Sequence, residues 1–193
     1  MAQADSGVEA NARLTSYVGL VLTVLLAVEF ISGLAIRKSL STHVLVGLLA
    51  VPPLALKLGS VGYRFVRYYA GEPRYRAAGA PALGMRLLAP LLVLLTAVVF
   101  ISGLELWFFG YRFGVFWIPL HHGSAYLWFV IVAAHVINYM RRALNLTAAD
   151  WKDHLQGALT RQSLVVASLI LGAALIIGML TFHSPFGFLA GES

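Results

Sequence analysis

Five long apolar runs constrain the fold of this 193-residue chain more than any other feature of its sequence. Each run supplies the roughly 20 apolar residues that a helix needs to cross a hydrocarbon core of about 30 Å. We place the spans at residues 15–36, 42–62, 83–108, 120–139 and 164–182. A spanning segment must satisfy its own backbone hydrogen bonds in lipid, which favours helices. The sequence therefore predicts an all-α integral membrane protein.

The composition supports this class and limits the chemistry. Hydrophobic residues make up 60% of the chain and charged residues only 11%, with a mean hydropathy of +0.82, whereas about a quarter of a soluble domain is charged. The chain has no cysteine, which excludes disulfides, thiolate-held iron–sulfur clusters and covalent c-type haem. No nucleophile–base pair, phosphate loop or zinc signature indicates a self-contained hydrolytic or transferase site. The six histidines are therefore the leading candidates for holding a redox centre.

The distribution of basic residues predicts the orientation in the membrane. Ten Lys and Arg residues fall in the N-terminal tail and in the segments after the second and fourth spans, against three on the other side. Because basic residues gather on the cytoplasmic side, we expect a cytoplasmic tail at 1–14, a transmembrane domain at 15–183 and an extracytoplasmic tail at 184–193. The net charge of +6 then indicates a membrane boundary, and no nucleic-acid partner is expected.

A short internal repeat divides the first four spans into two similar hairpins. The string Phe-Ile-Ser-Gly-Leu occurs at Phe30–Leu34 and again at Phe100–Leu104. Each copy precedes an outer loop and then a histidine at the start of the next span, which is His43 in one case and His121, followed by His122, in the other. We expect a pseudo-symmetric four-helix core of two hairpins, with a fifth transmembrane helix added.

The histidines of this repeat have the geometry expected of haem ligands. Spans two and four run in the same direction, so His43 and His121 lie at similar depth near the outer face and are predicted axial ligands of a b-type haem. His135 follows His121 by 14 residues, which places both within about 40° on one helix and about 21 Å apart, a spacing suited to a second haem. Gly33 and Gly103 either allow close helix packing or leave room for the flat macrocycle.

Other ionisable residues have several interpretations. Lys57 lies 14 residues after His43, at the position where a second haem would need a histidine. It has three interpretations: an unusual ligand opposite His135, a partner of a haem propionate, or the mark of a lost haem. Glu29 is a proton carrier at a quinone pocket, a hydrogen-bond partner of a ligand histidine, or a neutral buried carboxyl. Arg37 and Arg64 are candidate partners of haem propionates.

The stretches Lys57–Tyr69 and Leu120–Trp128, with His135 beyond them, resemble cytochrome b-type membrane subunits of bacterial respiratory enzymes, and more specifically actinobacterial cytochrome b-like proteins. The resemblance covers roughly residues 15–142. It implies a location in the bacterial cytoplasmic membrane, one or two b haems in a four-helix core, and an electron-transfer subunit rather than a self-contained enzyme. The implied partners are the quinone pool and an extracytoplasmic oxidoreductase subunit or domain.

A second hypothesis belongs to another functional class. Glu29, Lys57 and His135 are also what a cofactor-free membrane scaffold or a small proton or ion transporter would present, because ionisable residues inside a membrane commonly mark such paths. A visible absorption spectrum of the purified protein distinguishes the two hypotheses.

Overall fold

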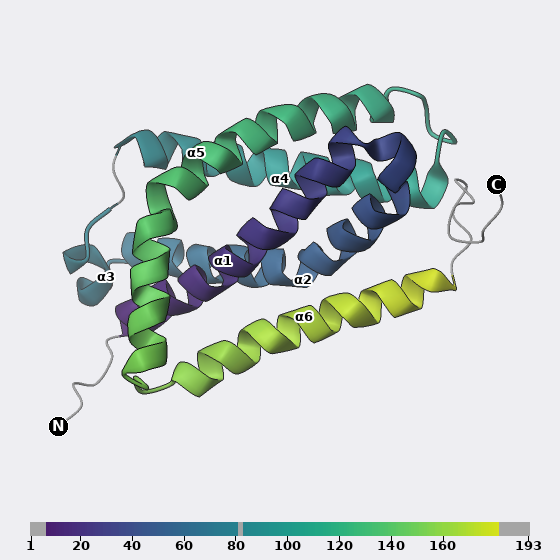
Figure 1. Ribbon diagram of the computed structural model, residues 1–193. Helices are drawn as coiled ribbons and strands as arrows, with labels where there is room; N and C mark the ends of the chain where they lie inside the picture. The colour runs from purple at the N-terminus through teal and green to yellow at the C-terminus, as the bar shows by residue number, and fades with distance from the viewer. Residues whose placement is uncertain (1–6, 81–82, 182–193) are drawn as a thin grey trace. The chain divides into compact units, whose positions relative to one another are not determined.

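The computed structural model describes residues 7–80 and 83–181, and over these residues the chain is helical with no strand (Figure 1). The helices are α1 (Gly7–Leu34), α2 (Ile36–Tyr69), α3 (Pro73–Ala77), α4 (Leu83–Phe109), α5 (Trp117–Lys152) and α6 (Ala158–Leu180). All of them except the short α3 are long and apolar enough to cross a membrane. The described part of the chain therefore confirms the prediction of an all-helical protein with five apolar spans.

The helices extend well beyond the apolar runs. The first begins at Gly7, inside the stretch predicted as a tail, while α2 continues to Tyr69 and α5 to Lys152. Helical backbone satisfies its own hydrogen bonds, so a helix does not have to end where the hydrocarbon ends. The predicted tail at 184–193, and His183 before it, lie outside the described residues.

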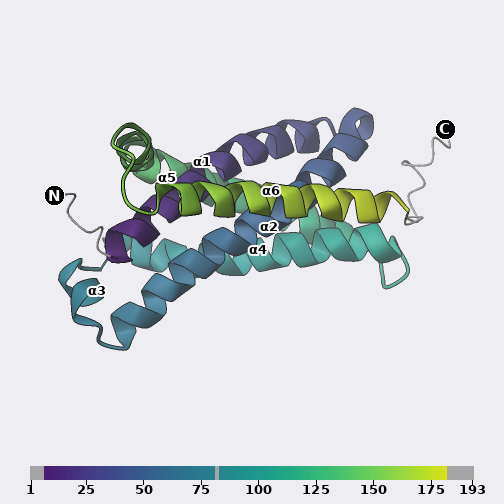
Figure 2. The same ribbon diagram turned by 90° about the horizontal axis from the view of Figure 1, so that it is seen from below.

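The first hairpin is built from α1 and α2, which run antiparallel and are joined through Ala35 alone (Figures 1 and 2). The bend is completed at Ser39, whose backbone dihedrals (φ −135°, ψ 26°) are not helical. The Ser39 hydroxyl lies 2.9 Å from the Ser32 carbonyl oxygen and 2.8 Å from that of Ala35. These contacts satisfy carbonyls at the end of α1, which have no partner within the helix.

The chain divides into two compact units. The first contains α1, α2, α3, the part of α5 from Tyr139 onward and most of α6. Its core is formed by Val18, Leu22, Ala50 and Val165. Gly172 of α6 packs against the backbone of α2 so closely that a Cβ there would lie 2.6 Å from the carbonyl oxygen of Leu49. Small residues at such contacts are typical of membrane helices.

The second unit contains α4 and the first part of α5, up to Asn138. Within it, the indole Nε1 of Trp128 donates a 2.7 Å hydrogen bond to the hydroxyl of Thr96, and both side chains are buried. Thr96 in turn donates to the carbonyl of Leu92 at 2.7 Å. Every polar atom of this contact is satisfied, as an apolar environment requires. The hydrogen bond therefore fixes the register of α5 against α4.

Candidate functional site

His121 lies near the start of α5, where α4 positions its ring. Its Nδ1 atom is 3.0 Å from the backbone carbonyl oxygen of Val99 and 3.0 Å from the hydroxyl of Ser102. A carbonyl oxygen can only accept, so Nδ1 carries the hydrogen in this contact. In the neutral imidazole the lone pair is then on Nε2, the tautomer in which Nε2 can bind a metal.

The glycines of the repeated string make room for the histidines. A Cβ on Gly103 would lie 3.0 Å from Cε1 of His121, and a Cβ on Gly33 would lie 3.6 Å from Cε1 and Nδ1 of His43. In both hairpins, therefore, the imidazole of the second helix packs on the glycine of the first.

His43 occupies the equivalent place in the first hairpin but meets an acid. Its Nδ1 lies 3.1 Å from Oε1 of Glu29, and the two side chains are only 21% and 13% exposed. Gly47, one turn beyond His43, leaves space for the carboxyl, since a Cβ there would lie 3.2 Å from Oε1. The carboxyl of Glu29 therefore lies next to a candidate ligand histidine, and its three interpretations stay predictions.

The side-chain ammonium of Lys57 has a hydrogen-bond partner inside the first hairpin. Its ammonium donates a 2.6 Å hydrogen bond to the backbone carbonyl of Thr15 on α1, and a Cβ on Gly19 would lie 2.8 Å from Nζ. The hydroxyls of Thr15 and Ser60 lie 2.9 Å apart, and the Asn11 amide donates to the Ser60 carbonyl at 3.1 Å. A lysine inside a membrane needs a polar partner, and α1 provides one.

The remaining predicted site residues are located but their roles stay predictions. His135 is half-buried on α5, the same helix as His121. Arg37 is exposed near the start of α2, and Arg64 is half-buried near its other end. Within residues 7–80 and 83–181, no group of three or more His, Asp or Glu side chains is placed to hold a metal ion. A haem iron needs no such group, because the porphyrin supplies four of its ligands.

Sequence reasoning missed a buried ion cluster in the first unit. Asp150 near the end of α5 is fully buried, and Arg161 in the first turn of α6 donates to both of its carboxylate oxygens, with Nε 3.0 Å from Oδ2. Arg13 of α1 approaches Oδ1 of the same carboxylate to 3.5 Å. Arg13 and Arg161 are among the ten basic residues from which the sequence predicts a cytoplasmic side, and charge alone gives no sign of their burial. The available signal was Asp150, which with Asp153 is one of two acids in a segment that otherwise carries basic residues.

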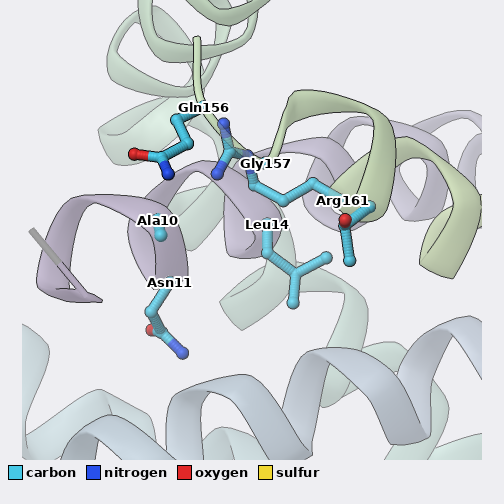
Figure 3. Close-up of a pocket in the computed structure, with 7 residues that line it drawn as sticks. Ala10, Asn11, Leu14, Gln156, Gly157 and Arg161 are labelled. Carbon is cyan, nitrogen blue, oxygen red and sulfur yellow. The ribbon is translucent and has the colours of Figure 1, made fainter. Parts of the chain in front are cut away.

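A pocket of about 470 Å³ lies next to this cluster. It is lined from α1, from the connection between α5 and α6, and from the first residues of α6 (Figure 3), namely by Ala10, Asn11, Leu14, Gln156, Gly157, Thr160 and Arg161. Its charged lining residue, Arg161, is already engaged by Asp150. The pocket is therefore bordered by an arginine that is already paired with a carboxylate and by uncharged side chains.

In each hairpin a histidine packs on a glycine and an oxygen atom lies near its Nδ1, in a hydrogen bond for His121 and in an acid–imidazole contact for His43. This likeness is internal to the chain. Comparison of the chain with protein-family models, with curated proteins and with solved structures finds no match.

Proposed function

We propose that this protein is a membrane b-type cytochrome that passes electrons between the quinone pool and an extracytoplasmic redox partner. The observation that carries the proposal is the repeated histidine environment. In each hairpin an imidazole packs on the glycine of the repeated string, and an oxygen atom lies near its Nδ1, at 3.0 Å for His121 and 3.1 Å for His43. Haem-ligating histidines commonly have an acceptor at the second ring nitrogen.

His43 and His121 would hold a b-type haem through their Nε2 atoms, an assignment that rests on their matched depth in the sequence. A bound haem supplies a one-electron couple between ferric and ferrous iron. Val99 and Ser102 hold the ring of His121 in the tautomer required, and Glu29 contacts the ring of His43 at the corresponding nitrogen.

The chain supplies surroundings that suit such a centre. Apolar spans provide the low-polarity environment in which ligand type and neighbouring charge set the potential of a haem. A haem near the outer face would connect the quinone pool with a partner outside the membrane. The number of haems is one in this proposal, because the ammonium of Lys57 is engaged by Thr15 and the inner position of the first hairpin has no histidine.

The test is the visible spectrum of the protein purified in detergent after expression with adequate haem. We expect a Soret band and an α-band that sharpens on reduction, with a haem-to-protein ratio near one. His43→Ala and His121→Ala should each abolish the bands, while His122→Ala, at an exposed neighbouring position, should retain them.

Two results would refute the proposal. A colourless wild-type preparation excludes the cytochrome and favours the scaffold or transporter hypothesis. Full haem content in both His43→Ala and His121→Ala shows that other residues hold the haem.

A further inference from the structure

The lipid-facing side of α2 can be followed beyond the predicted span. Four apolar side chains along this part of the helix are exposed, namely Leu58, Val61, Phe65 and Tyr69. At 100° per residue these positions lie within about 80° of one another, over a length of about 16 Å. A stripe of exposed apolar side chains on a membrane helix faces lipid, and tyrosine is enriched where lipid meets water. The stripe therefore places the membrane boundary near Tyr69.

At this boundary the chain folds back into what we call the α2–α3 corner, residues 63–76. Gly71 makes the turn with a φ of +88°, a conformation that glycine adopts without strain. Helix α3 then returns to the start of α1 (Figure 2), where the buried Tyr75 donates a 3.4 Å hydrogen bond to the carbonyl of Gly7. The ring of Tyr75 also packs edge-on against Tyr63, with centroids 6.0 Å apart. The short α3 is thus anchored to both long helices of the first hairpin.

The corner concentrates positive charge at this level. It carries four basic residues and one acid, a net charge of +3, from Arg64, Arg67, Arg74, Arg76 and Glu72. Arg67 is engaged within the corner, because its Nε donates to the hydroxyl of Tyr63 at 3.1 Å and its Nη1 lies 3.6 Å from Glu72. Arg74 and Arg76 are exposed on α3, and Arg64 is half-buried on α2. Three guanidinium groups therefore remain to give the surface its charge.

We propose that the α2–α3 corner binds the phosphate groups of anionic phospholipids. The lipid-facing stripe is continuous with the corner and so places the arginines at the level of the head groups. Basic residues next to a membrane attract anionic lipid, and a guanidinium presents several N–H donors in a geometry that matches phosphate. This continuity favours a lipid over a soluble acidic protein as the partner. The inference needs no haem and is independent of the proposed function.

The test is native mass spectrometry of the detergent-purified protein, titrated with phosphatidylglycerol or with zwitterionic phosphatidylcholine. We expect the wild type to bind phosphatidylglycerol more tightly. Arg74→Gln combined with Arg76→Gln should weaken that binding about 25-fold, which is about fivefold for each basic residue near the surface. The matched control is Lys38→Gln combined with Arg112→Gln. It also removes two exposed basic residues, but from the side predicted to be extracytoplasmic, and should leave the affinity unchanged.

Three outcomes decide the inference. Arg74→Lys combined with Arg76→Lys should keep most of the affinity, which separates a loss of charge from a loss of structure. Equal affinity of the wild type for the two lipids overturns the inference and leaves an acidic protein as the partner of this charge. Equal weakening by the corner variant and the control also overturns it, because binding would then follow the total charge of the chain. The visible spectrum tests the proposed function separately, so either proposal can fail without the other.

Discussion

Replacing Gly103 by alanine should separate the packing role of this glycine from its helix propensity. The added Cβ would lie 3.0 Å from Cε1 of His121, whereas ordinary contact begins at 3.4 Å. The ring must therefore withdraw by a few tenths of an ångström. Its 3.0 Å contacts with Val99 and Ser102 would then lengthen past about 3.2 Å, the upper end of the usual range for an N–H···O bond.

The expected magnitude is the balance of two effects. Alanine in a helix interior is favoured over glycine by about 0.5–1 kcal/mol, and loss of one internal hydrogen bond costs about 0.5–1.5 kcal/mol. Gly103→Ala should thus change the free energy of unfolding little in the presence of His121. In the His121→Ala background the same substitution should be stabilising by about 0.5–1 kcal/mol, because no ring opposes the new methyl group.

The assay is a double-mutant cycle on the haem-free protein, unfolded reversibly in detergent and followed by tryptophan fluorescence. Gly33→Ala is the internal comparison, since its Cβ would be in ordinary contact with His43 at 3.6 Å and should not lower stability. Equal stabilisation by Gly103→Ala in both backgrounds would show that the close contact does not constrain the ring.

Two further predictions concern the buried charges. Lys57→Met should retain the full haem content of the wild type, because the ammonium is engaged by the Thr15 carbonyl; loss of haem, measured as haem-to-protein ratio, would support Lys57 as a ligand. Arg161→Ala should lower the free energy of unfolding by about 3–5 kcal/mol, because it leaves the fully buried Asp150 without its main partner. The double substitution Asp150→Asn with Arg161→Met should recover most of that loss, and no recovery would contradict the explanation by uncompensated charge.

Periodicity and hydropathy were sufficient to predict the helical class, because a helix that crosses lipid needs a long uninterrupted apolar run. They could not predict where the helices end. The polar continuations of α2 to Tyr69 and of α5 to Lys152 carry no hydropathy signal, although their backbones remain helical.

The side-chain contacts were predictable only in part. The repeat drew attention to Gly33, Gly103 and both histidines because it is visible in sequence order. The Asp150–Arg161 pair is formed across the α5–α6 connection, and such a contact depends on how the chain turns between two helices. Counting charges included Arg161 among the basic residues of the cytoplasmic side but could not show that its side chain is buried.

The single-residue connection at Ala35 has a consequence for how the protein is made. The entropic cost of closing a chain segment grows with its length, so bringing α2 back along α1 costs little. The contacts between these helices are also local in sequence, a property of fast-folding topologies. Helices α1 and α2 should therefore enter the bilayer as a preformed pair during synthesis, with His43 already next to Glu29 before α4 has left the ribosome.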